Sequence, residues 1–261
     1  MDKEKLLSHL HREEDRILGG SILDKIELVI KRKNEETTNF LDPYEREITI
    51  NLCKQFYDIN YLEDGGYKKA ERQRINIFPE YLFVDHIDSP VSILKIEGNF
   101  DFCPVNHRDY LGAVMGLGIK RKMIGDLLVL DDFAQLVVGD EIKDFLLLKL
   151  KRVNEVPVSV NEIKRDDLVF PTDNAKVIKA TVASMRLDAI ASAGFGDSRN
   201  RISRKIKNEK IKLNWKPENN PAQTIELNDL ISFKGRGRVK VVEENGHSHR
   251  GRIKLTLKRY T

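Results

Sequence analysis

The sequence predicts an α+β protein in three parts, and three observations support this. Residues 1–75 have apolar residues at helical spacing, whereas residues 76–160 have short apolar runs typical of strands. From residue 181 to the end there are 18 Lys and Arg against 8 Asp and Glu, a net charge of +10. The preceding 180 residues hold 27 basic and 33 acidic residues, a net charge of −6, so the overall +4 conceals a basic module on an acidic scaffold.

Residues 1–75 are expected to be helical. The D-P-Y-E run at 42–45 is a strong helix start, with Asp at the N-cap, Pro at the first helical position and Glu three residues after the cap. Apolar residues then recur at the spacing of one helix face and are expected to meet a core: Ile48, Leu52, Phe56 and Ile59. The glycine pair at 65–66 ends this stretch, and a charged turn of helix is expected at 70–74.

Residues 76–160 are expected to form a ferredoxin-like domain, the fold of the RNA-recognition motif. Its βαββαβ order follows from short β-branched runs alternating with helical patterns. The expected strands are Val91–Ile96, Leu127–Leu130, Gln135–Val138 and Val156–Val160, and the expected helices are Asn106–Gly116 and Asp140–Leu150. A further strand-like run is Tyr81–Val84, just before the first of these strands.

Residues 161–180 are expected to link this domain to the basic module. The segment contains four consecutive charged residues at 164–167 and Pro171, and it ends in a strand-like run at 177–182. We therefore expect a helical region at 1–75, a ferredoxin-like domain at 76–160 and a small α+β domain at 181–261.

The basic module centres on a helix that starts at Ser198. Ser198 can cap this helix, while Ile202 and Ile206 form a narrow apolar stripe. Residues 199–207 include five Lys and Arg and no acid. A solvated helix normally mixes both signs of charge, so this pattern favours a surface that meets phosphates, which the planar fork of Arg grips well.

Two further segments extend this cationic surface. Lysines alternate with apolar residues over 210–216, a strand pattern with one basic face, and cations lie on a glycine-opened loop at 234–238. The residues expected to bind RNA are Arg186, Ser198, Arg199, Arg201, Arg204, Lys205, Lys207, Lys210, Lys212, Lys216, Lys234, Arg236 and Arg238.

The order of these motifs resembles the RNA-binding domain named after ribosomal small-subunit protein four. The resemblance rests on R-L-D at 186–188, the helix after Ser198, K-I-K-L-N at 210–214 and N-D-L-I at 228–231. It covers about 60–70 residues and implies RNA binding by the basic positions. The family usually has Gly where Glu209, Trp215 and Asn228 stand, which puts the geometry of three turns in doubt.

The chain also resembles the YlmH family of Gram-positive bacteria over nearly its whole length. This resemblance rests on F-L-D-P-Y-E at 40–45, G-G-Y-x-x-A-E-R-Q-R at 65–74 and the stretch from His107 to Asp126. It implies a non-enzymatic RNA-binding protein encoded among cell-division genes. It also implies association with the large ribosomal subunit carrying peptidyl-tRNA, in the rescue of stalled ribosomes.

A second RNA contact is a hypothesis for Lys120, Arg121 and Lys122, three consecutive cations in the acidic part of the chain; a solvated loop is the alternative. By contrast, the expected middle strands of the ferredoxin-like domain carry no aromatic residue. We therefore expect that its sheet does not stack bases as an RNA-recognition motif does.

An enzyme remains the main alternative function. Pseudouridine synthases often carry the same small RNA-binding domain and use an Asp within an R-L-D triplet, and the only such triplet is at 186–188. Because this triplet opens the RNA-binding domain itself, we expect Asp188 to be structural and the protein to have no catalytic residues. A division-linked scaffold that binds protein partners through the acidic part is a third reading.

Composition bounds the remaining classes. The longest apolar runs are far shorter than the roughly 20 residues of a membrane-spanning helix, and the charged N-terminus lacks the apolar core of a secretory signal. Cys53 and Cys103 lack metal-type spacing, and His247 and His249 have no cysteine or acid nearby at ligand spacing. We expect a cytoplasmic monomer without metal or cofactor, which binds ribosomal or transfer RNA.

Overall fold

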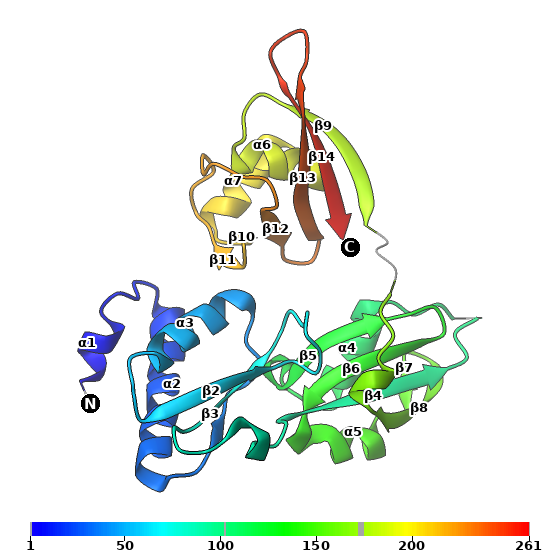
Figure 1. Cartoon of the computed structure of the whole chain (residues 1–261). Helices are drawn as coiled ribbons and strands as arrows, with labels where there is room; N and C mark the ends of the chain where they lie inside the picture. Colours follow the sequence, from blue (N-terminus) through cyan, green and yellow to red (C-terminus); the bar gives the residue numbers. More distant parts are fainter. Residues whose placement is uncertain (1, 102, 172–174, 261) are drawn as a thin grey trace. The chain divides into compact units, whose positions relative to one another are not determined.

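The computed structural model describes residues 2–101, 103–171 and 175–260. The chain divides into two compact units, Met1–Pro171 and Thr172–Thr261, each with its own sheets and apolar core (Figure 1). Helices and strands are mixed in both, which confirms the expected α+β class. Within the described ranges, no helix is long and apolar enough to cross a lipid bilayer.

The N-terminal part of the first unit packs three helices against a small sheet (Figure 1, blue to cyan). Its helices are α1 (Lys3–Leu7), α2 (Glu13–Arg32) and α3 (Pro43–Cys53), and its strands are β1 (Glu36–Thr37), β2 (Ile59–Asp64) and β3 (Arg74–Pro79). The strand order is β1-β3-β2. Ile26, Leu52 and Ile75, from α2, α3 and β3, are fully buried in the shared core.

The start of α3 is as the sequence predicts. The Glu45 N–H donates to the Asp42 carboxylate at 3.0 Å, and the Asp42 N–H donates back to the Glu45 carboxylate at 2.8 Å. This reciprocal capping box satisfies two donors that the first helical turn cannot use. It fixes where α3 begins and presents its apolar side, including Leu52, to α2.

The expected helical region is wrong after α3. The helix ends at Cys53, so Phe56 and Ile59 do not lie on its face, and residues 59–79 contain the antiparallel pair β2 and β3. Residues 70–73 form an irregular loop instead of a helical turn. All six residues of β3 are buried, including the polar Arg74 and Asn76, although the run R-I-N-I at 74–77 alternates polar and apolar residues as a half-buried strand does.

The second part of the first unit has the ferredoxin-like element order that the sequence predicts. Its elements are β4 (Val91–Gly98), α4 (His107–Gly116), β5 (Ile124–Val129), β6 (Phe133–Gly139), α5 (Lys143–Lys149), β7 (Arg152–Val153) and β8 (Val156–Ile163). The strands pair antiparallel in the order β5-β6-β4-β8-β7. Tyr81–Val84 is not a strand: a turn and a 3-10 helix at Val84–His86 occupy this stretch.

A carboxylate joins the two parts of the first unit. Asp126 on β5 accepts hydrogen bonds from the Tyr67 hydroxyl at 2.7 Å and from the backbone N–H groups of Glu71 at 2.6 Å and Arg72 at 3.0 Å. The Arg72 guanidinium in turn donates to the backbone carbonyls of Phe40 and Ile124. These bonds hold the loop at 70–73, where the sequence predicts a helical turn, against β5.

The second unit wraps two helices with an antiparallel sheet. Its elements are β9 (Lys176–Val182), α6 (Leu187–Phe195), α7 (Arg199–Lys207), β10 (Ile211–Leu213), β11 (Lys216–Pro217), β12 (Leu230–Phe233), β13 (Gly237–His247) and β14 (Ile253–Tyr260). The strand order is β11-β10-β12-β13-β14-β9. At Gly194 on α6, a Cβ would lie only 2.6 Å from Val239, so glycine allows α6 to pack directly on β13.

The link between the parts is shorter than the expected 161–180. Strand β8 continues to Ile163, and β9 already begins at Lys176. Between them, Arg165 donates to Asp64 at 2.6 Å, which ties this segment to the first unit. The boundary between the two units follows Pro171. The finer division at residues 75 and 160 stays a prediction.

Helix α7 ends in a left-handed turn at Glu209, which has φ +53°. The Lys210 N–H donates to the Lys205 carbonyl at 3.0 Å, and the Glu209 N–H donates to the Ile206 carbonyl at 2.8 Å. These two bonds form the Schellman motif, in which glycine is the usual residue at the left-handed position. The turn that glycine usually shapes is therefore kept, although a side chain is present.

We expect Glu209→Gly to stabilise the second unit by about 1 kcal/mol, because glycine adopts positive φ without steric penalty. The matched control is Lys207→Gly in the last turn of α7, where glycine should destabilise by about 1 kcal/mol. Thermal unfolding measures both changes. Similar effects of the two substitutions would contradict the left-handed turn at Glu209.

We expect Asp126→Asn to destabilise the first unit by about 2 kcal/mol, because an amide cannot accept all three hydrogen bonds that the carboxylate receives. Asp131→Asn, at an exposed turn between β5 and β6, is the control with the same change of charge. The measurement is the unfolding temperature of each full-length variant. Equal values for the two variants would show that Asp126 does not hold the junction.

Candidate nucleic-acid interface

The expected cationic helix is present and is anchored by two isoleucines. Ile202 and Ile206 are fully buried, and the Ser198 hydroxyl accepts the Arg201 N–H at 3.4 Å as an N-cap. The remaining surface of α7 is therefore turned away from the core. The Arg201 side chain is 76% exposed. Arg204 and Lys207 are exposed and Lys205 is half-buried.

Two predicted RNA-binding arginines have a structural role. Asp188, at the start of α6, is almost buried and accepts hydrogen bonds from Arg186 at 3.0 and 3.2 Å and from Arg199 at 2.9 Å. Burial acts to raise the pKa of Asp188, but the hydrogen bonds and charges of both arginines outweigh it and lower that pKa. Since Arg186 precedes α6 and Arg199 opens α7, this cluster fixes the start of one helix against the other.

Arg236 is also held in place. Its guanidinium donates to the Asp197 carboxylate at 2.8 Å and to the Phe195 carbonyl at 2.9 Å, and it lies 5.6 Å from the centre of the Phe233 ring. The pKa of Asp197 is lowered, mainly by the hydrogen bond from the Ser198 N–H and further by the positive charges of Arg236 and Arg201. Arg236 thus ties the turn between β12 and β13 to the segment between α6 and α7.

The remaining predicted cations surround this framework. The Lys234 N–H donates to the Lys210 carbonyl at 3.4 Å, which brings the turn after β12 to the end of α7. Lys210, Lys216 and Lys234 are exposed, while Lys212 and Arg238 are half-buried on the sheet. The structure thus gathers the predicted residues on neighbouring elements. Arg186, Arg199 and Arg236 bind acids of the unit, Arg201 is exposed and also pairs with Asp197, and Arg204 and Lys207 are exposed.

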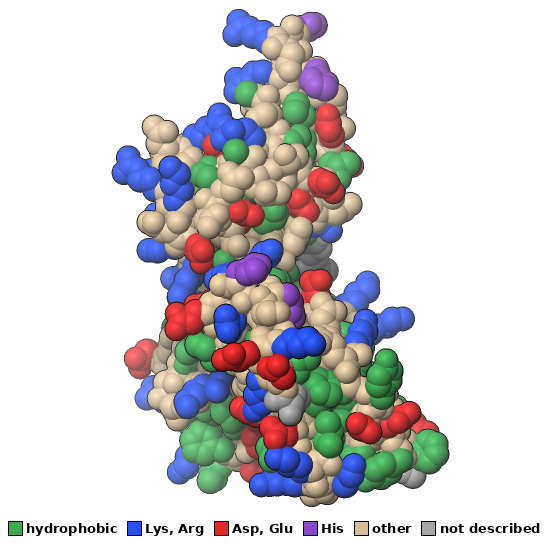
Figure 2. Space-filling model, turned by 90° about the vertical axis from the view of Figure 1, so that its left-hand side faces the viewer, with side chains coloured by type: hydrophobic (Ala, Val, Ile, Leu, Met, Phe, Trp, Pro, Cys, Tyr) green, Lys and Arg blue, Asp and Glu red, His purple; other side chains and the backbone are tan. Residues whose placement is uncertain are grey.

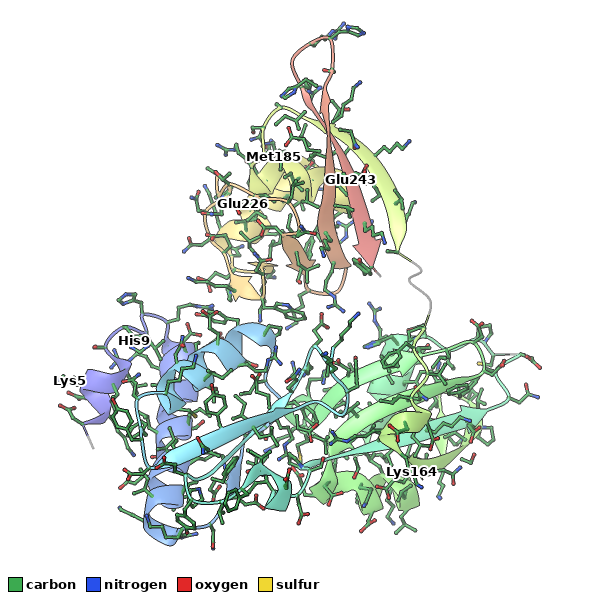
Figure 3. All side chains as sticks on the ribbon, viewed as in Figure 1. Lys5, His9, Lys164, Met185, Glu226 and Glu243 are labelled. Carbon is green, nitrogen blue, oxygen red and sulfur yellow. The ribbon has the colours of Figure 1, made fainter. Side chains whose placement is uncertain are left out.

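The surface view agrees with this division. In the second unit, the upper part of Figure 2, Lys and Arg side chains lie along one side of the face in view and Asp and Glu along the other. Two of the acids, Glu226 and Glu243, are labelled in Figure 3; they belong to the loop before β12 and to β13. Helix α7 itself, Arg199–Lys207, contains no Asp or Glu.

The tip of the hairpin formed by β13 and β14 was not predicted from the sequence to belong to the interface. The tip projects beyond the rest of the second unit (Figure 1) and carries four exposed basic or titratable side chains: His247, His249, Arg250 and Arg252. These residues lie within six consecutive positions, so the sequence groups them already, and the pairing of β13 with β14 places them at the tip of a hairpin. Within the described residues, no three His, Cys, Asp or Glu side chains could together hold a metal ion.

The three cations at 120–122 are placed differently from one another. Lys120 and Lys122 are exposed, but the Arg121 guanidinium donates to the backbone carbonyls of Ile124 at 2.5 Å and Gly125 at 3.2 Å. Burial, together with the charge of Arg72, lowers the pKa of Arg121 to about 10. A second RNA contact at this loop stays a prediction and concerns the two lysines alone.

The ferredoxin-like sheet has no open face around its centre. Strand β6 starts at Phe133, two residues earlier than expected, so an aromatic residue does lie on a middle strand. However, Gln135 and Val137, on the same face, are buried, and Phe40 and Leu168 pack over this region. The Gln135 side chain accepts the Val169 N–H at 3.1 Å. The chain itself thus covers the sheet around Gln135 and Val137, whereas Phe133 is half-buried with the Lys95 ammonium 4.4 Å from its ring centre.

Comparisons with known proteins cover the same three parts. One family model, "YlmH, N-terminal", matches residues 19–82, a second, "Putative RNA-binding domain in YlmH", matches 85–167, and the S4 domain matches 185–231. The "Ribosome-associated protein quality control protein P2" of Bacillus subtilis (strain 168) is 30% identical over 248 residues, which cover 95% of this chain and 96% of the relative.

A solved structure described as "Cell division protein ylmH from Streptococcus pneumoniae" is also similar. Its TM-score is 0.53 at 26% identity, and the match covers 60% of this chain and 96% of that one. The family models and the Bacillus subtilis relative, but not the 60% covered by this structural match, reach from the N-terminal helices through the ferredoxin-like part to the basic module. The chain belongs to the YlmH family.

Proposed function

We propose that this protein binds ribosomal or transfer RNA on the large ribosomal subunit during the rescue of stalled ribosomes, without catalysis. The observation that carries the proposal is the acid-free helix α7, in which Arg201, Arg204 and Lys207 are exposed while the two isoleucines are buried. An exposed row of cations on a fixed helix is suited to the phosphate backbone, which dominates the affinity of proteins for nucleic acids. The name of the Bacillus subtilis relative supports the ribosome as the site of action.

The framework beneath α7 also favours binding over chemistry. Asp188, the residue that a pseudouridine synthase reading would make catalytic, is surrounded by Arg186 and Arg199 and is nearly buried. A catalytic carboxylate must reach the reacting atoms of its substrate, whereas this one is occupied by two guanidinium groups. This supports a structural role for Asp188 and a protein without catalytic residues.

The wider context follows from the same proposal. A factor that acts on ribosomes works in the cytoplasm, and a single copy per ribosomal site is consistent with a monomer. The name of the Streptococcus pneumoniae structure supports a link to cell division, which we place downstream of ribosome binding. Contacts with phosphates determine how the protein is oriented on the ribosome. They do not read the base sequence of the RNA.

We expect replacement of Arg201, Arg204 and Lys207 by Gln to weaken RNA binding and to flatten its salt dependence. For every phosphate that the variant no longer neutralises, the slope of log K against log salt should fall by about 0.7 to 0.9. The control replaces Lys176, Lys179 and Lys254 by Gln; these exposed lysines lie on β9 and β14 and carry the same total charge. Fluorescence anisotropy with a labelled ribosomal RNA hairpin over a salt series measures both variants.

The same pair of variants tests the site of action. When lysate is sedimented through sucrose, the wild-type protein and the control should travel with the large subunit, whereas the α7 variant should remain at the top of the gradient. Crosslinking followed by sequencing of bound RNA identifies the RNA that is contacted. Equal cosedimentation of all three proteins would contradict the proposed role of α7.

We expect Asp188→Asn to destabilise the second unit by about 2 kcal/mol at neutral pH, because it removes charge-assisted hydrogen bonds from two arginines. The pKa of Asp188 is lowered in the folded protein, so its contribution is present above the ordinary Asp pKa of about 3.9 and is lost as the pH falls below that value. The difference in unfolding free energy between wild type and variant should therefore shrink as the pH is lowered from neutral to about pH 3.

Glu226→Gln, in an exposed loop of the same unit, is the control and should show no such convergence. The enzyme reading is tested with the same protein. Pseudouridine formation by purified wild type that disappears in Asp188→Asn would overturn the non-catalytic proposal.

A further inference from the structure

Trp215 has an unusual backbone conformation for a tryptophan. It occupies the second position of the two-residue turn between β10 and β11, where Leu213 faces Lys216. Its φ is +70° and that of Asn214 is +47°, the pattern of a type I′ turn, which usually contains Asn-Gly. A bulky residue at positive φ is a steric outlier, and such outliers concentrate at functional sites.

The turn holds Trp215 firmly in this place. The Asn214 amide donates to Asp229 at 2.7 Å and accepts the Leu230 N–H at 2.9 Å, while the Asn214 N–H donates to the Leu230 carbonyl at 2.9 Å. These bonds dock the turn on the start of β12. The indole is thus carried by a fixed turn, which lowers the entropy lost when a ligand binds to it.

The surroundings of Trp215 match a nucleic-acid ligand. Trp215 is half-buried, and the Arg238 guanidinium lies over the indole ring, 5.3 Å from its centre. In the strand register, Lys212 on β10, Ser232 on β12 and Arg238 on β13 lie side by side, on the face of the sheet opposite the core residues Ile211, Ile231 and Val239. Trp215 is therefore an aromatic surface beside a row of cations, the combination by which proteins bind single-stranded nucleic acid.

A second observation indicates an incomplete site at this place. The Ser232 hydroxyl, between Lys212 and Arg238 in the row, is buried and has no hydrogen-bond partner among the described residues. Buried hydroxyls are almost always satisfied, so an orphan requires an explanation. A ligand with polar edges that rearranges the neighbouring Arg238 side chain would supply a partner.

We propose that Trp215 stacks on an unpaired RNA base, with Lys212 and Arg238 contacting the phosphates on either side. This rests on the proposed function, because it assumes that the second unit binds RNA, and it adds the class of nucleotide that the unit selects. Stacking on an aromatic ring is tolerant of base identity but requires a base that is not paired. The site therefore distinguishes loops and bulges from continuous duplex.

The test uses full-length protein and two RNA hairpins, one with a single bulged adenine and one fully paired. Trp215→Gly and Trp215→Leu should each lose affinity for the bulged hairpin about tenfold and bind the paired hairpin as wild type does. Trp215→Phe keeps an aromatic ring and should remain within about threefold of wild type. Asn228→Gly is the control for glycine at a left-handed turn, since Asn228 has φ +73°, and should bind both hairpins unchanged.

Stability separates this role from a purely structural one. Trp215→Gly should raise the unfolding temperature by several degrees, because glycine suits positive φ, while it weakens binding. If Trp215 were only structural, its replacement would lower the unfolding temperature and the RNA affinity together. Trp215 is also the single tryptophan of the chain, so its fluorescence should be quenched by the bulged hairpin and much less by the paired one.

Each outcome decides between the two proposals. Wild-type affinity of Trp215→Gly and Trp215→Leu for the bulged hairpin, or equal losses on both hairpins, would overturn base stacking and leave the function of α7 intact. Failure of the wild-type protein to bind either hairpin would contradict the proposed function itself, and the stacking proposal would fall with it.

Discussion

A carboxylate that is shielded from water needs donors around it, and this constraint decides how segments are joined in both units, at the half-buried Asp126 and the nearly buried Asp188. Asp126 collects a hydroxyl and two backbone N–H groups, so that a loop of the N-terminal part must lie against β5. Asp188 collects two guanidinium groups, so that α6 and α7 must start side by side. In each case, one acid determines the position of segments that the apolar cores alone would leave free to slide.

The same constraint sorts the cations of the second unit into two groups. Arg186, Arg199 and Arg236 neutralise acids within the unit and so build the surface. Arg201, Arg204 and Lys207 are exposed on α7, where their mutual repulsion favours an anionic ligand, although Arg201 also lies 3.7 Å from the Asp197 carboxylate. The basic residues of the second unit thus either stabilise its fold or form the surface for an anionic ligand. The contacts of each side chain show which role it has.

Much of the fold could be predicted from local patterns. The cap at Asp42, the order of elements from β4 to β8 and the helix after Ser198 depend on short-range spacing, which the sequence displays directly. Strand β3 was missed although R-I-N-I at 74–77 alternates polar and apolar residues, because the helical region was expected to extend to residue 75. The left-handed turns at Glu209 and Trp215 could not be inferred either, because the residue types there disfavour the conformation that the fold imposes.

The sequence identified the basic residues of the candidate site, but not their positions relative to one another or their partners. Spacing identifies which residues are basic, whereas the partners of Arg199 and Arg236 lie on other elements and depend on tertiary packing. The indole of Trp215 is a similar case. Its neighbour Arg238 is 23 positions away in sequence and adjacent only through the pairing of β10, β12 and β13.

The position of β9 has a consequence for behaviour at high concentration. β9 is the outermost strand of the six-stranded sheet. Among the described residues, the N–H and C=O groups along its outer edge face no other strand of this sheet, and such an edge can pair with a second molecule. Lys176 and Lys179 are exposed along it. Two such edges would bring like charges together, so the lysines discourage edge-to-edge aggregation and help to keep the sheet closed to other copies of itself.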